Sequence, residues 1–130
     1  MVTPRIGNVE ARIMRVLWER GRATAREITE ALNESRPIAH STVQTLLRKL
    51  EAKQAVAHDV EDRTFVFRAL VAPNEVRRRA TRELLDRLFD GSPGGLITYL
   101  VKHEGLSEED VETIRELLRE EEMNAEGNDE

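Results

Sequence analysis

Between Ala39 and Lys53 the apolar side chains recur at intervals of three and four residues, which is the spacing of one face of an α-helix. They are Val43, Leu46, Leu47 and Leu50. A stripe of this kind has to be buried against neighbouring elements, because a helix of this length is only marginally stable by itself in water. We therefore expect a helix from about Ala39 to Lys53 that packs into a small helical core.

Two further amphipathic helices are expected before this segment. The first runs from about Asn8 to Arg20 and ends at Gly21. The second begins with a capping box, in which Thr24 accepts a hydrogen bond from the amide near Glu27 while the Glu27 side chain reaches back, and it ends near Glu34. Short helices joined by such tight turns indicate a helix-turn-helix.

Two strand-like runs follow the third helix, from Ala55 to Val60 and from Thr64 to Leu70. A two-stranded hairpin is unstable by itself, so it has to lean on the helices. Three helices followed by such a hairpin form a winged helix-turn-helix, to which we assign residues 1–71. The aromatic residues Trp18, Phe65 and Phe67 lie on apolar faces and are expected in the core.

The second half of the chain predicts three more helices and no further strand. The first begins at Pro73 and continues to about Gly91. The second opens with a Ser92 cap and ends at Gly105, and the third begins at Ser107. The fold class is therefore mainly α with a small β wing. We assign residues 72–122 to a helical dimerisation domain and residues 123–130 to a disordered tail, because the sequence is polar from about residue 120.

The apolar stripes of these C-terminal helices have too little neighbouring chain to cover them. A twofold dimer, in which the stripes of two subunits cover each other, is the economical solution. The alternative is that the stripes pack back on the winged helix. The residues expected at the dimer contact are Val76, Ala80, Leu84, Leu88, Leu96, Leu100, Val111, Ile114, Leu117 and Leu118.

The net charge of -5 hides an uneven distribution of charge. Residues 1–70 carry twelve Lys and Arg against nine Asp and Glu, whereas residues 71–130 carry eight against sixteen. The stretch from Ser35 to Leu50 contains Arg36, Arg48 and Lys49 and no acid. Contacts to phosphate act within a Debye length of about 8–10 Å, so local charge matters more than the total. The first half therefore favours double-stranded DNA as a partner.

The sequence resembles the penicillinase-repressor family, the BlaI/MecI group that also includes the copper-responsive CopY repressors. The matching stretches are Glu10, Ile13-Met14 and Val16-Leu17-Trp18 in the first helix, Ser41 to Lys53 in the third, and Leu106-Ser107-Glu108-Glu109 before the last. The absence of cysteine suits a reducing cytoplasm, where we expect the protein. The resemblance implies a homodimer with N-terminal winged helices and intertwined C-terminal helices. It also implies transcriptional repression through palindromic operators with TACA/TGTA half-sites.

The polar face of the third helix is the expected site of DNA recognition. Threonine methyl groups can contact thymine, Gln44 can bond adenine, and Arg48 can bond guanine or a phosphate. By resemblance, Arg63 matches the tip of the wing. His40, near the start of the third helix, is expected to contact a phosphate. The expected DNA-binding residues are thus His40, Ser41, Thr42, Gln44, Thr45, Arg48, Lys49 and Arg63. The plainer interpretation of this face is an ordinary solvated helix surface.

Several positions depart from the family pattern. Family members that are released by proteolysis are cut by a membrane sensor-protease at an Asn-Phe bond, and the matching position here is Tyr99-Leu100. Copper-responsive members carry a cysteine cluster, and this sequence has no cysteine. Gln54 replaces a usual glycine and Phe67 a usual tyrosine. The sensor-protease and the inducing signal are therefore unidentified.

The remaining features argue against other classes of function. His40, His58 and His103 are scattered, so we expect no metal and no other cofactor. There is no nucleophile motif or glycine-rich phosphate loop, so an enzyme is not expected, and no apolar run is long enough for membrane insertion. The arginine cluster at positions 77–79 and 82 is expected to pair with glutamates of the last helix, within one subunit or across the dimer, and the alternative is a contact with DNA. The alternative function is a winged-helix module for protein interaction or assembly without operator specificity.

Overall fold

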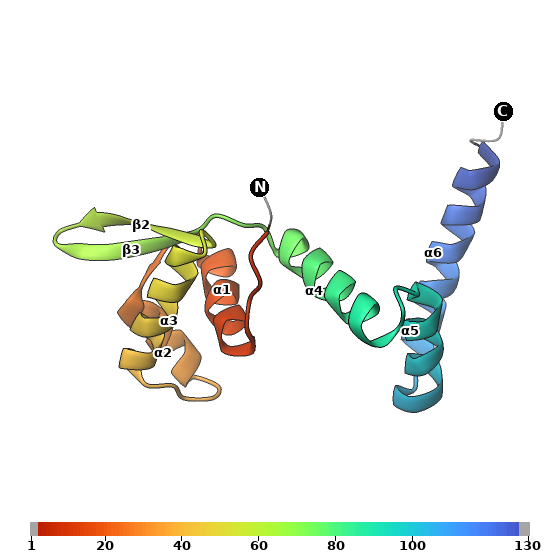
Figure 1. The fold of residues 1–130 in the computed structure, drawn as a ribbon, viewed down its shortest axis with the longest axis horizontal. Coiled ribbons are helices and arrows are strands. Elements are labelled where there is room, and N and C mark those ends of the chain that lie inside the picture. The colour runs from red at the N-terminus through yellow and green to blue at the C-terminus, as the bar shows by residue number, and fades with distance from the viewer. Residues whose placement is uncertain (1–2, 128–130) are drawn as a thin grey trace. The chain divides into compact units, whose positions relative to one another are not determined.

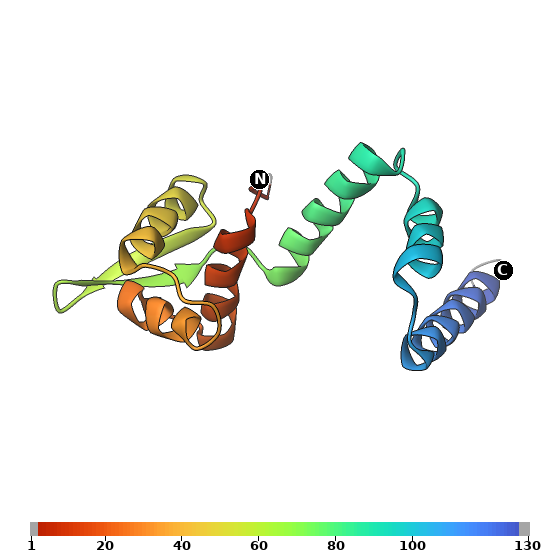
Figure 2. The same ribbon diagram turned by 90° about the horizontal axis from the view of Figure 1, so that it is seen from below.

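The computed structural model describes residues 3–127 and divides the chain into two compact units, one up to Glu83 and one from Leu84 onward (Figures 1 and 2). The predicted fold class, mainly α with a small β wing, is confirmed. The elements in chain order are α1 (Asn8–Arg20), β1 (Ala23–Thr24), α2 (Ala25–Asn33), α3 (His40–Ala52), β2 (Val56–Glu61), β3 (Thr64–Ala69), α4 (Pro73–Leu88), α5 (Pro93–Tyr99), a π-helical turn (Leu100–Glu104) and α6 (Glu108–Gly127).

Helices α1, α2 and α3 surround the core of the first unit. Their apolar stripes are almost fully excluded from solvent, and the base of the hairpin completes the cluster. The largest fully buried side chains are Ile13, Met14, Leu17, Ile28, Val43, Leu47, Leu50 and Val56. Full burial of an aliphatic side chain of this size contributes about 1.5–3 kcal/mol. Trp18 lies at the edge of this core, and its Nε1 donates to the carbonyl of Val71 at 2.9 Å.

The first two helices begin and end where local capping chemistry places them. The backbone N–H of Glu27 donates to Oγ1 of Thr24 at 3.1 Å, and the N–H of Thr24 donates to Oε1 of Glu27 at 2.9 Å, which confirms the predicted capping box. The backbone N–H of Thr24, and then its side chain, lower the pKa of Glu27 below its usual range. The stabilising effect of this cap is therefore present at neutral pH and is lost as the pH falls through the lowered value. Helix α1 ends at Gly21, whose φ of 82° favours glycine.

The predicted hairpin is confirmed as β2 and β3, and a short third strand that the sequence did not predict extends the antiparallel sheet in the order β1-β3-β2. The additional strand β1 consists of Ala23 and Thr24, which pair with Phe67 and Val66. Two residues are too few to show the alternation by which strands are recognised in a sequence. The pairing with β3 is also a long-range contact, which the local pattern does not contain.

The β2–β3 hairpin is the wing, and its outer end extends beyond the helices (Figure 1). Val60 is opposite Phe65, and His58 is opposite Phe67. Phe67 is buried as expected, but Phe65 is 49% exposed, which corrects its assignment to the core. The helices cover only the base of the hairpin, so a side chain nearer the turn stays accessible although it lies on the same face.

In the second unit the structure changes two predicted helix ends and keeps the predicted bounds of the helix between them. Helix α4 ends at Leu88, a few residues before the expected Gly91. Helix α5 is capped by Ser92, whose Oγ accepts from the N–H of Gly95 at 3.0 Å, and it passes into the π-helical turn before Gly105. Helix α6 continues to Gly127, so residues 123–127 are helical where the sequence predicted a disordered tail, and residues 128–130 lie outside the described part. Between Glu108 and Glu126 no proline or glycine interrupts a run rich in helix-forming residues.

The residue after the C-cap of α3, Gln54, offers a direct test of the backbone conformation. Gln54 adopts a φ of 65°, a left-handed conformation that favours glycine. We expect Gln54→Gly to raise the free energy of unfolding by about 0.5–1 kcal/mol in a urea titration followed by circular dichroism. The matched control is Gln44→Gly in the middle of α3, which should lower it by about 1 kcal/mol. A loss of stability in Gln54→Gly would contradict the assigned conformation.

Candidate nucleic-acid interface

The face of α3 opposite the core carries most of the residues that the sequence singled out. The buried positions Val43, Leu47 and Leu50 fix how the helix is rotated about its own axis. The six polar positions of the opposite face are all exposed: Ser41, Thr42, Gln44, Thr45, Arg48 and Lys49. These side chains therefore form one continuous solvent-facing surface along two to three turns of helix.

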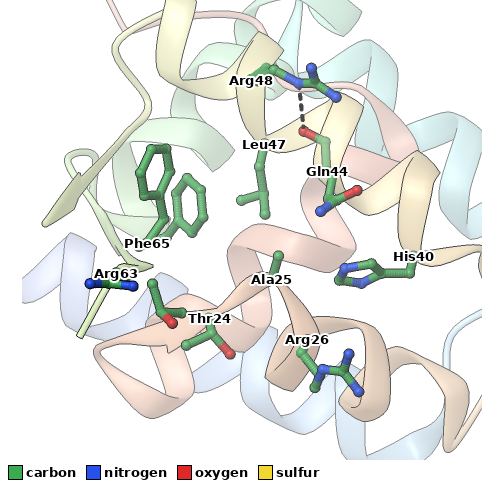
Figure 3. A pocket seen from close by; sticks show the side chains of 11 residues that line it. Thr24, Ala25, Arg26, His40, Gln44, Leu47, Arg48, Arg63 and Phe65 are labelled. Atoms are coloured by element: carbon green, nitrogen blue, oxygen red, sulfur yellow. Dashed lines mark hydrogen bonds between the residues drawn. The ribbon is translucent and has the colours of Figure 1, made fainter. Parts of the chain in front are cut away.

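Two side chains on this surface are held by hydrogen bonds to their own helix. Oγ1 of Thr45 donates to the carbonyl of Ser41 at 3.0 Å. Nε of Arg48 donates to the carbonyl of Gln44 at 3.4 Å (Figure 3). Both bonds leave the far ends of the side chains available, namely the methyl group of the threonine and the terminal guanidinium nitrogens of the arginine.

A cleft of about 810 Å³ lies beside α3, between the N-terminal end of α2 and the wing (Figure 3). Its lining residues are Thr24, Ala25, Arg26, His40, Gln44, Leu47, Arg48, Arg63, Thr64, Phe65 and Phe67. Three of them are arginines and none is acidic, so the cleft favours an anion. The structure thus brings together four of the predicted residues, His40, Gln44, Arg48 and Arg63. Ser41, Thr42, Thr45 and Lys49 do not line the cleft.

Arg26 is a cleft residue that the sequence reasoning missed. It occupies the first turn of α2, the first helix of the helix-turn-helix, and its side chain is exposed. In this motif the first helix crosses the DNA backbone, and a helix N-terminus attracts phosphate. A cation inside the capping box, directly before Glu27, is the signal that identifies the position, but its use requires knowing that α2 begins beside α3.

His40 occupies the first turn of α3 and connects it to α2. Its Nδ1 lies 2.9 Å from Oγ1 of Thr29, whose hydroxyl donates to the carbonyl of Ala25 at 2.8 Å. The hydroxyl has a single hydrogen, so Nδ1 is the donor in the bond to the histidine. Nε2 is the ring nitrogen that this bond leaves available. The bond thereby fixes the ring at the edge of the cleft.

The turn of the wing places a cation at a position that normally suits glycine. Asp62 and Arg63 connect the paired residues Glu61 and Thr64, with φ values of 48° and 65°. Two-residue turns of this type prefer Asn-Gly or Asp-Gly. An arginine at the second position is held there against its backbone preference, which is characteristic of functional positions.

Ion pairs neutralise two of the three acids in the wing. The guanidinium of Arg22 contacts the carboxylate of Glu61, and the hydrogen bond to that carboxylate raises the pKa of Arg22 above its usual value. Nε of Arg68 lies 3.4 Å from Oδ2 of Asp59. The paired acids repel a nearby polyanion less than free carboxylates would.

The only acid of α3 points to the wing. The carboxylate of Glu51 contacts Nδ1 of His58, and the ring of His58 stacks on Phe65 with centroids 3.8 Å apart and an angle of 10° between the planes. These three side chains connect the C-terminal end of α3 to the hairpin. Sequence reasoning missed it because the residues come from three separate elements.

The predicted dimer residues lie on α4, α5, the π-helical turn and α6. Val76, Leu96 and Val111 are half-buried, and Ala80 is exposed. The large apolar side chains that are exposed include Leu84, Leu88, Leu100, Ile114, Leu117 and Leu118, with Leu88 at 63%. Tyr99 and Leu100, at the position of the family's cleavage bond, end α5 and begin the π-helical turn.

Within residues 3–127 no group of three or more His, Cys, Asp or Glu side chains is arranged to hold a metal ion. In the same part of the chain no helix has the length and hydropathy required to cross a membrane. His40, His58 and His103 belong to three different elements. Nε of Arg79 lies 3.2 Å from Oε1 of Glu83 in its own helix.

Comparisons with known proteins agree with these features. The model of the penicillinase repressor family matches residues 6–120. The methicillin resistance regulatory protein MecI of Mammaliicoccus sciuri is 23% identical over 116 residues, which cover 89% of this chain and 94% of the relative. The penicillinase repressor of Bacillus licheniformis is 24% identical over 117 residues, which cover 90% and 91%. The solution structure of the DNA-binding domain of the repressor BlaI is similar with a TM-score of 0.51 at 28% identity, covering 58% of this chain and 93% of that one.

The bond between Thr29 and His40 yields a stability prediction. Thr29 is 7% exposed, and Thr29→Val keeps its shape while it removes the hydroxyl that is bonded to Nδ1 of His40. We expect the free energy of unfolding to fall by about 1–3 kcal/mol, because a partly buried donor loses its acceptor. Thr42→Val on the exposed face is the control and should change it by less than about 0.5 kcal/mol. Equal effects of both variants in urea titrations would show that the bond does not anchor α3.

Proposed function

The chain belongs to the penicillinase-repressor family of DNA-binding transcriptional repressors, which are not enzymes, and from this premise we propose that it represses transcription as a homodimer on palindromic operators. The observation that carries the proposal is the acid-free cleft, in which Arg26, Arg48 and Arg63 gather beside the exposed face of α3. We assign residues 1–71 to DNA binding and residues 72–122 to dimerisation.

Helix α3 is the element proposed to enter the major groove. Gln44 can pair with adenine through its amide, and the terminal nitrogens of Arg48 can bond guanine or a phosphate. Thr45, whose hydroxyl is bonded to the carbonyl of Ser41, offers its methyl group to thymine. Ser41, Thr42 and Lys49 complete the surface. The TACA/TGTA half-sites are taken from the family resemblance and are the proposed target.

Phosphate contacts are proposed for the rim of the cleft. Arg26 and the N-terminus of α2 lie at one side, Arg63 lies on the wing, and His40 lies between α2 and α3. Each cation that neutralises a phosphate releases a counterion, so binding should weaken steeply with salt. These contacts set the position of α3 on the duplex rather than the sequence it prefers.

A second copy of the chain is the proposed cover for the exposed apolar side chains of α4 to α6. Contiguous exposed leucines, such as Leu84 and Leu88 or Leu117 and Leu118, are typical of an interface rather than of a free surface. A twofold dimer would present two α3 helices to half-sites about one DNA turn apart, roughly 34 Å.

The proposed function can be tested by electrophoretic mobility shifts. The full chain is titrated into promoter fragments and into scrambled duplexes of equal length, at several salt concentrations. A complex that prefers particular promoter sequences and weakens with salt is expected. Equal, weak binding to all duplexes would contradict operator recognition and favour the protein-interaction module.

The Arg63→Gly variant distinguishes the contribution of the wing to DNA binding from its contribution to stability. Glycine relieves the left-handed backbone of the turn, so stability should be retained or increased. Loss of the wing cation should nevertheless weaken operator binding roughly tenfold and reduce the salt dependence by about one counterion. Gln54→Gly is the matched control, because it relieves the same conformation outside the cleft and should leave affinity unchanged. Unchanged affinity in both variants would remove the wing from the interface.

The dimer is tested by sedimentation equilibrium of the full chain and of Leu118→Glu. Leu118 is 58% exposed on α6, and a charge there should be strongly unfavourable in an apolar interface. The wild type should sediment at twice its 14.9 kDa at micromolar concentration, and the variant should shift toward the monomer. Arg119→Glu, on the neighbouring polar position, is the control. A folded wild-type monomer would contradict the proposal.

A further inference from the structure

The N-terminal segment of residues 3–7 lies between α3 and α4 and is bonded to both. We name it the strap, and we propose that it sets the direction in which α4 leaves the winged helix, and through this the operator spacing that the dimer accepts. The inference rests on the proposed dimeric repressor. It assigns a role in spacing specificity to Arg79 and Lys53, which touch no residue of the cleft.

One side of the strap is bonded to α4. Nη1 of Arg79 donates to the carbonyl of Thr3, and its Nε donates to Oε1 of Glu83 at 3.2 Å. The other oxygen of Glu83, Oε2, lies 3.7 Å from Nε of Arg5. Two residues of α4 one turn apart therefore contact two residues of the strap.

The other side of the strap is bonded to the end of α3. Nζ of Lys53, the C-cap residue of α3, donates to the carbonyl of Arg5 at 3.0 Å. The same nitrogen donates to both oxygens of Glu10 at 2.7 and 2.9 Å. Glu10 is only 7% exposed and also accepts the N–H of Gly7 at 2.9 Å. Ile6 packs against the core, so the strap is held by apolar as well as polar contacts.

The strap matters because its bonds reach α4 beyond the point at which the chain enters this helix. The chain passes from β3, which ends at Ala69, to Pro73 through a short connection. In that connection the carbonyl of Val71 accepts a hydrogen bond from Trp18. This bond fixes the position of the connection but not the direction of α4. Contacts from the strap to Arg79 and Glu83, farther along α4, supply the second point that defines the direction of the helix.

The direction of α4 matters for DNA because α4 continues as one helix to Leu88, past the contacts with the strap. A dimer binds a palindrome only when its two recognition helices match the separation of the half-sites. A stiff connection between α3 and α4 would reject wrong spacings, whereas a loose one would tolerate them. The individual contacts of the strap are exposed or partly exposed, so they are suited to bias a direction rather than to hold the core together.

The test compares Arg79→Met with Arg77→Met. Both remove one arginine from α4, but Arg77 is exposed and does not contact the strap. The probes are a duplex that the wild type enriches from a random library, versions with the spacing between half-sites changed by about one or two base pairs, and a single half-site. The full chain is used throughout, and affinities are measured by mobility shift.

The wild type and Arg77→Met should bind the duplex with the enriched spacing about tenfold or more tightly than the duplexes with altered spacing. Arg79→Met should keep its half-site affinity within about twofold, while its preference among spacings falls to about threefold or less. Arg79→Lys, which retains a donor for the carbonyl of Thr3, should restore part of the preference. Arg5→Met, at a side chain that is 71% exposed, loosens the strap without touching the core and should act in the same direction.

An unchanged spacing preference in Arg79→Met and Arg5→Met would overturn the proposed role of the strap. An equal loss of half-site and full-site affinity, with no change in preference, would also overturn it, because the contacts would then only support the fold. Failure of the proposed function is a different result, since the wild type would then enrich no duplex from the library.

Discussion

Burial of one face of α3 is the constraint on which the rest of the structure depends. Val43 and Leu50 are completely buried and Leu47 nearly so, against α1, α2 and the base of the hairpin. A helix held in this way cannot rotate about its axis without exposing several apolar side chains, each worth about 1.5–3 kcal/mol. The opposite face is therefore presented to solvent in a fixed orientation, which is what recognition of a base sequence requires.

The electrostatic character of the interface is local and is concealed by the net charge. The protein carries a charge of -5, yet the cleft beside α3 contains three arginines and no acid. Acids close to it are engaged with partners of opposite or complementary character: Glu61 with Arg22, Asp59 with Arg68, and Glu51 with His58. Two of these pairs, Glu61 with Arg22 and Glu51 with His58, also connect the wing to the rest of the domain, so these contacts contribute both to charge neutralisation and to shape.

The features that the sequence predicted well depend on local contacts, whereas the features that it missed depend on contacts between distant segments. The bounds of α1, α2 and α3 follow from periodicity and from caps such as Thr24 and Gly21, which act within a single turn. Three other features depend on contacts between segments that are distant in the sequence: strand β1, the exposure of Phe65 and the place of Arg26 in the cleft. The contacts of Arg79 and Lys53 with the strap, likewise, span 76 and 48 residues of sequence. The polar face of α3 was accessible to sequence reasoning because it is the complement of a local apolar stripe.

The central claim is that the exposed face of α3 and the adjoining cleft form the DNA-binding surface. The most direct measurement is an NMR titration of the isotope-labelled full chain with a duplex that it enriches from a random library. The account predicts that amide shifts concentrate in three segments: residues 24–26, residues 40–49 and residues 61–64. Shifts that avoid all three segments and appear elsewhere on the chain would contradict it.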